Sequence, residues 1–152
     1  MTIGDTAAAV GRGLFAGAAG TVAMTVSSTL EAKGRARGSS TAPADAAGKV
    51  LGVEPRDEAG KARFSNIVHW SYGTSWGAVR GLLHAAGVDG AKATALHFGA
   101  IWGGAQVMLP VLDVAPPPWK SPPREILIDA FHHSVYAIVT GLAFAALQDS
   151  SS

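Results

Sequence analysis

The 152-residue sequence predicts an all-α integral membrane protein, a four-helix bundle with a short hairpin between its second and third spans. The chain is 48% hydrophobic and 15% charged, whereas about 25% of a typical soluble domain is charged. Four segments are long enough to cross a bilayer, which takes roughly 20 residues of helix. The faces opposite their polar residues carry Phe, Ile, Leu and Val, whereas a soluble bundle, the alternative fold, would carry Lys and Glu there.

The spans are predicted at residues 11–31, 64–86, 91–113 and 125–148, within a single domain covering 1–152. A polar loop over residues 33–63 separates the first two spans, and a tight turn at residues 87–90 joins the next two. The proline-rich segment at residues 114–124 connects the last pair. Because Lys and Arg are concentrated in the loops at 33–63 and 114–124, we expect both loops to be cytoplasmic and both termini to lie outside.

Composition excludes several classes of function. The net charge is +1 with no basic stripe, so we expect no nucleic-acid partner. The absence of cysteine excludes disulfides, thiolate metal sites and cysteine nucleophiles. No G-x-S-x-G elbow, P-loop or dinucleotide-binding fingerprint occurs, which argues against an enzyme of the soluble type.

Polar residues gather on one face of the second span and on one face of the fourth at about 100° per residue. Such residues face the interior of a membrane bundle, because exposing an ionisable group to lipid costs several kcal/mol. The rise of about 1.5 Å per residue separates them into two groups, near about 10 Å and between about 18 and 24 Å from the cytoplasmic edge. The inner cluster comprises His69, Tyr72, Gln106, Asp129, His132, His133 and Tyr136. The outer constriction comprises Trp76, Arg80 and His97.

Three interpretations of the inner cluster remain open. It is a hydrogen-bond network that holds the helices in register, a proton or ion pathway, or a metal or haem site. The candidate ligands for a metal are His69, Asp129, His132 and His133. No HxxxH or ExxH motif is present, and adjacent histidines on a helix diverge by about 100°, so the sequence requires no cofactor. Arg80 is expected either to extend its side chain to the interface or to form an anion-selective constriction with His97 and Trp76.

Glycines indicate where helices approach closely. Gly13, Gly17 and Gly20 lie on one face of the first span, and we expect a homo-oligomer to form through this small-residue face. Gly99 and Gly103 form a GxxxG pair in the third span and predict a second packing face.

The stretch NIVHWSYGTSWGAVRGLL is followed by a Gly-rich third span ending in QVMLP, then by PPPW and DAFHHSVYAIVTG. This order of motifs, over roughly residues 66–144, resembles the YagU-like family of small bacterial inner-membrane proteins. The resemblance implies a multi-span α-helical protein of the bacterial inner membrane. It implies no activity and no catalytic residues.

The sequence therefore predicts an inner-membrane protein whose buried His/Asp site passes or binds a proton, an ion or a small solute. Substituting His69→Ala or Asp129→Asn should then abolish transport. One alternative is an accessory or scaffold subunit of a larger membrane complex, in which the same changes would lower stability and abundance. A second alternative is a protein that binds haem or a divalent metal. The expected partners are the lipid bilayer, a second copy of the chain and a larger complex.

Overall fold

The computed structural model describes residues 2–36 and 40–150, and this part of the chain is helical without strands. Residues 37–39 of the predicted first loop lie outside the described residues. The four long helices, which coincide with the four predicted spans, are α1 (Ile3–Gly34), α3 (Glu58–Ala85), α4 (Gly90–Val111) and α5 (Pro123–Asp149). The connections hold the short helix α2 (Ala42–Leu51) and a 3-10 turn, η1 (Pro118–Lys120).

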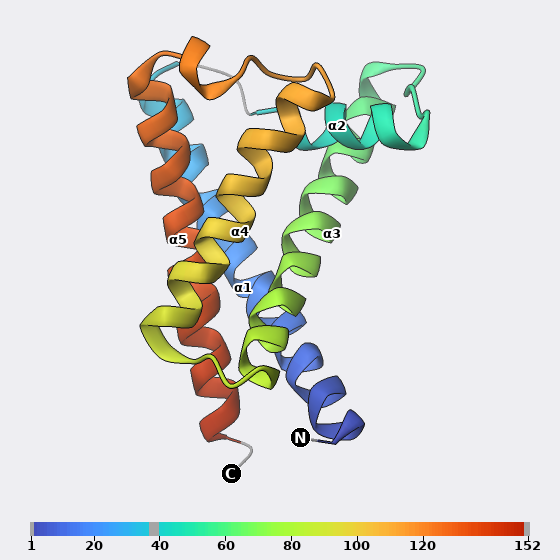
Figure 1. Cartoon of the computed structure of the whole chain (residues 1–152). Coiled ribbons are helices and arrows are strands. Elements are labelled where there is room, and N and C mark those ends of the chain that lie inside the picture. The colour runs from blue at the N-terminus through green and yellow to red at the C-terminus, as the bar shows by residue number, and fades with distance from the viewer. Residues whose placement is uncertain (1, 37–39, 151–152) are drawn as a thin grey trace.

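The long helices run side by side between two ends of the molecule (Figure 1). Helix α2 and the connection containing η1 lie at one end, and the termini lie at the other end with the α3–α4 hairpin. Helix α1 packs most extensively against α3 and α5, whereas α4 packs mainly on α5. The bundle is therefore organised around α1.

Helix α1 begins with a capping box. The Thr2 side chain accepts a hydrogen bond from the Asp5 backbone N–H, and the Asp5 carboxylate accepts one from the Thr2 backbone N–H at 2.7 Å. That second bond lowers the pKa of Asp5 below its usual value. At the far end of α1, Arg35 forms ion pairs with Glu125 of α5 and, at 3.0 Å, with Glu31. Hydrogen bonds to the two carboxylates raise the pKa of Arg35, and Glu125 makes the larger contribution. The pair with Glu125 also ties α1 to α5 at this end.

Helices α1 and α3 touch through glycines. A Cβ at Gly17 would lie 2.7 Å from the carbonyl oxygen of Thr74, and a Cβ at Gly77 would lie 2.7 Å from the Cα of Gly17. Gly13 faces Gly77 in the same way, and Gly20 faces Thr140 of α5. The small-residue face of α1 is therefore occupied within the chain, and a homo-oligomer would have to form through another face.

The second predicted packing face is not used within the described chain. A Cβ at Gly99 or Gly103 would meet nothing within 4 Å. Helix α4 instead buries the side on which Ala93, His97 and Ile101 recur every four residues. The helix has one inward face, and the glycines lie away from it.

Apolar side chains cover the outside of the bundle. Most of the large hydrophobic residues that the sequence assigned to the outer faces of α3 and α5 are exposed, which confirms that part of the prediction: Ile67, Leu82, Leu127, Phe131, Ile138 and Leu142. Phe64 and Val135, assigned to the same faces, are part-buried. Most of the buried hydrophobic residues are alanines. Among the described helices, α1 and α5 are long and apolar enough to cross a membrane, by length and composition alone.

Helix α2 connects the first loop to the end of α4. It ends at Gly52, whose φ of 65° lies in the left-handed region. The Nζ of Lys49 donates to the carbonyl oxygens of Leu112 and Asp113 at 2.6 and 3.1 Å. These carbonyls follow the last turn of α4, so the lysine caps that helix from another element.

Candidate functional site

The predicted inner cluster separates into two groups. The first group faces α1, which supplies two hydroxyl partners, Thr25 and Ser27, that the sequence analysis did not single out. His69 Nε2 lies 2.8 Å from Thr25 Oγ1, and His132 Nδ1 lies 2.9 Å from Ser27 Oγ. His132 Nε2 lies 3.8 Å from a carboxylate oxygen of Glu31. Helices α3 and α5 thus each place one histidine against α1.

One neutral tautomer of His132 is compatible with both contacts of Ser27. The Ser27 hydroxyl donates its one proton to the carbonyl oxygen of Met24 at 3.0 Å and then accepts from Nδ1 of His132. In that tautomer Nε2 carries no proton, and this nitrogen is directed towards Glu31.

The second group joins α4 to α5. Asp129 Oδ2 accepts hydrogen bonds from Trp102 Nε1 at 2.9 Å and from Gln106 Nε2 at 3.1 Å. The Nδ1 of His133 lies 2.9 Å from the carbonyl oxygen of Asp129 and 3.3 Å from its carboxylate. Trp102 was missed because an indole donor leaves no signature in a sequence.

The two groups matter for the predicted metal site. The candidate ligands His69 and His132 turn to α1, whereas Asp129 and His133 form the α4–α5 group. Among the described residues, no group of three or more His, Cys, Asp or Glu side chains is arranged to hold a metal ion. The four candidates therefore do not form one ligand set.

The two predicted tyrosines lie in different places. Tyr136 is 3% exposed, and its hydroxyl donates to the carbonyl oxygen of Gly73 at 2.5 Å. Its ring centroid lies 5.7 Å from that of His97. Tyr72 is 37% exposed and packs edge-on against Trp76, so it lies at the surface of the bundle.

The outer group is buried and incompletely paired. His97 is fully buried; its Nε2 lies 2.9 Å from the carbonyl oxygen of Trp76, and its Nδ1 has no hydrogen-bond partner. Trp76 therefore contributes its backbone, not its indole, to this group. Since a carbonyl only accepts, Nε2 carries the proton.

Arg80 is 2% exposed. Its side chain therefore stays inside the bundle, and the expectation that it extends to the interface is wrong. The guanidinium lies 4.3 Å from the ring centroid of Phe144, and Nη2 lies 3.5 Å from Asp89. Its Nε and Nη1 atoms have no hydrogen-bond partner. Asp89 also lies 2.8 Å from Nδ1 of His84, which in turn contacts Gln148 of α5. This polar group at the hairpin end was not predicted, because its members are brought together only by the folding of α3 against α5.

A line of titratable side chains can be followed along the bundle, buried in the middle and more exposed at its two ends. In order they are Glu31, His132, Tyr136, His97, Arg80 and Asp89. Neither a family model nor a curated protein nor a solved structure matches this chain.

Proposed function

We propose that the protein crosses the bacterial inner membrane with α1, α3, α4 and α5 and that it passes protons along the interior of the bundle. The shortest of these helices, α4, has 22 residues, which at about 1.5 Å per residue suits a hydrocarbon core of about 30 Å. The exposed Phe, Ile, Leu and Val side chains also support lipid as the surroundings, since soluble monomers rarely expose so continuous an apolar surface.

The proposed orientation follows from charge. The loops at 33–63 and 114–124 hold most of the lysines and arginines, and they meet at one end of the bundle (Figure 1). The positive-inside rule assigns this end to the cytoplasm and the termini to the outside. The resemblance of residues 66–144 to the YagU-like family stays a prediction and agrees with this location.

The position of Tyr136 carries the proposal of proton transfer. This buried ring lies one helical turn from His132 and 5.7 Å from the ring of His97. It therefore links the histidine near Glu31 to the histidine near Arg80. Burying titratable groups in a bilayer is costly, and apolar contacts would hold the helices without that cost. A transport role explains why the line is present.

Both histidines are set up to exchange a proton. Each has one ring nitrogen that donates to a fixed oxygen, Ser27 Oγ for His132 and the Trp76 carbonyl for His97. The other nitrogen is the one that takes up a proton. Histidine suits this role because it ordinarily titrates near neutral pH.

The proposed path favours protons over metal cations because it consists of buried side chains. The fixed positive charge of Arg80, between His97 and Asp89, opposes any cation on this path, a proton included. A proton can hop between side chains and needs no open channel. We therefore expect proton flux without measurable Na⁺ or K⁺ flux.

The test is proton uptake into liposomes that contain the purified protein and a trapped pH-sensitive dye, driven by a potassium diffusion potential. We expect His132→Gln and His97→Gln to reduce the protein-dependent rate at least about tenfold, since proton relays of this kind contribute factors of about 10²–10⁴. His69→Gln is the matched control, because it removes a part-buried histidine that is bonded to Thr25 and lies off the line. Wild-type protein that leaks no faster than empty liposomes would refute the proposal.

A scaffold role is the second candidate, and the α4–α5 group favours it. Trp102 and Gln106 of α4 both donate hydrogen bonds to Asp129 of α5, so these three side chains join the two helices directly. If the wild type passes no protons and His132→Gln, His97→Gln and Asp129→Asn all lower the unfolding temperature, the polar residues serve packing alone.

A further inference from the structure

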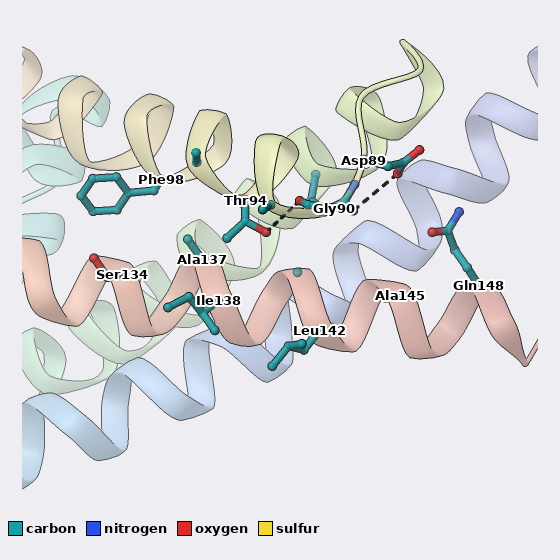
Figure 2. Close-up of a pocket in the computed structure, with 14 residues that line it drawn as sticks. Asp89, Gly90, Thr94, Phe98, Ser134, Ala137, Ile138, Leu142, Ala145 and Gln148 are labelled. Carbon is teal, nitrogen blue, oxygen red and sulfur yellow. Dashed lines mark hydrogen bonds and ion pairs between the residues drawn. The ribbon is translucent and has the colours of Figure 1, made fainter.

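A groove of about 720 Å³ opens between α4 and α5 beside the α3–α4 hairpin. Figure 2 shows Phe98 of α4 and Ile138 and Leu142 of α5 along its length, with Asp89 and Gln148 at one end. The groove is thus apolar along most of its wall and polar at the hairpin end.

Arg80 lines the polar end, and its charge is only partly compensated. Two of its guanidinium nitrogens, Nε and Nη1, have no hydrogen-bond partner although the side chain is almost completely buried. Its one ion pair, with Asp89, is long at 3.5 Å. Buried charged groups are normally paired and hydrogen-bonded, so an unpaired guanidinium indicates a place for another anion.

The N-terminus of α4 lies at the same end of the groove, where Gly90 and Ala91 form part of the lining. Asp89 occupies the N-cap position but makes no side-chain cap hydrogen bond, because its carboxylate is directed to His84 and Arg80. The first N–H groups of this 22-residue helix are therefore left to a ligand. Helix N-termini favour anions through these N–H groups and the helix dipole.

We propose that the groove binds an anionic phospholipid. The headgroup phosphate lies between Arg80 and the first turn of α4, and one acyl chain lies along Phe98, Ile138 and Leu142. Charge complementarity identifies the occupant: arginine and a helix N-terminus both bind phosphate, and the apolar wall suits a hydrocarbon chain. Asp89 is half-exposed and lies in the hairpin turn, so its carboxylate can turn to solvent and release Nη2 to the phosphate.

The lipid site shares Arg80 and Asp89 with the proposed proton path but does not use its histidines or Tyr136. Binding depends on the groove and on Arg80, and it needs no proton transfer through His132 or Tyr136. A lipid-binding measurement can therefore succeed or fail independently of the flux measurement.

The experiment is native mass spectrometry of the delipidated protein in detergent, titrated with dipalmitoyl phosphatidylglycerol, dipalmitoyl phosphatidylcholine or inorganic phosphate. We expect phosphatidylglycerol to bind the wild type about tenfold more tightly than phosphatidylcholine, because both lipids carry the phosphate but phosphatidylcholine also carries a quaternary ammonium, which the charge of Arg80 repels. Equal binding of the two lipids would overturn the proposal. Inorganic phosphate that displaces phosphatidylglycerol at equal concentration would show a phosphate site without an acyl groove and would also overturn it.

Variants test the two parts of the site separately. Arg80→Leu should reduce phosphatidylglycerol binding about tenfold, whereas Asp89→Asn should strengthen it several-fold because it removes the competing carboxylate. Asp89→Asn keeps the proposal falsifiable if Arg80→Leu fails to fold, since weaker or unchanged binding would contradict it. Ala145→Trp should fill the groove and abolish binding. Ala146→Trp, on the neighbouring exposed alanine that does not line the groove, is the control and should bind as the wild type does.

Discussion

At the crossing of α1 and α3, the absence of a single methyl group decides how closely two helices approach. A Cβ at Gly77 would lie 2.7 Å from the Cα of Gly17, and backbone atoms cannot move aside as a flexible side chain does. Gly77→Ala should therefore lower the free energy of unfolding by about 1–3 kcal/mol, the usual cost of overpacking. Thermal unfolding in detergent, followed by circular dichroism, measures the change.

The matched control is Gly99→Ala on α4, where the added Cβ meets nothing. Alanine is a better helix former than glycine by about 0.5–1 kcal/mol, so this variant should be neutral or slightly more stable in a monomer. Equal unfolding temperatures for the two variants would mean that the α1–α3 contact is looser than the structure has it.

At the scale of an element, α4 depends on α2 for the end of its last turn. Lys49 is the donor to the carbonyl oxygens of Leu112 and Asp113. Lys49→Met keeps the length of the side chain but removes the donor, and the end of α4 should open more often. We expect the amide hydrogens of residues 112–114 to exchange about fivefold faster, which corresponds to about 1 kcal/mol of local stability.

Lys61→Met is the comparison for this element. Lys61 pairs with Glu58 on the exposed first turn of α3 and touches no other helix. Lys61→Met should leave the exchange of the amide hydrogens at residues 112–114 unchanged, because exposed ion pairs contribute little to stability. Faster exchange in both variants would show a general loss of stability and not a local cap.

For the whole molecule, the decisive property is on which side of the membrane each end lies. The chain has no cysteine, so single cysteines can be introduced without a background. We expect a membrane-impermeant maleimide to label Ala86→Cys and Ser150→Cys in intact spheroplasts. Val53→Cys and Trp119→Cys should react only after the membrane is permeabilised.

The labelling pattern distinguishes the ways in which the proposed membrane topology could be wrong. Reaction of Val53→Cys and Ala86→Cys from the same side would contradict a membrane span by α3. If Val53→Cys and Trp119→Cys react from outside and Ala86→Cys and Ser150→Cys do not, the chain has four spans in the opposite orientation. Release of the protein by alkaline carbonate would show that it does not cross the membrane.

Much of the fold could be predicted because it depends on local pattern. Long apolar segments, a tight turn at Gly87 and Gly90, and polar faces at helical spacing are all read along one helix at a time. The outer faces of α3 and α5 are the confirmed example, since side chains such as Ile67 and Phe131 are exposed. One pattern that the sequence does contain was not used in the prediction. Gly73, Gly77 and Gly81 recur every four residues and form the α3 side of the contact with α1.

The sequence by itself determined the helical composition, the ends of α4 and α5 to within two residues and the polar face of α5, whereas α1 and α3 begin earlier than predicted, at Ile3 and Glu58. Only the tertiary structure decided the partners of that face. His132 lies against Ser27 and Glu31, and Asp129 accepts hydrogen bonds from Trp102 and Gln106. One predicted cluster is thereby divided into two groups. It also turned Gly99 and Gly103 away from the core. The reason is physical, because periodicity fixes which residues share a face but carries no information about the rotation and depth at which one helix meets the next. Those quantities are set by the summed packing of side chains that are distant in the chain.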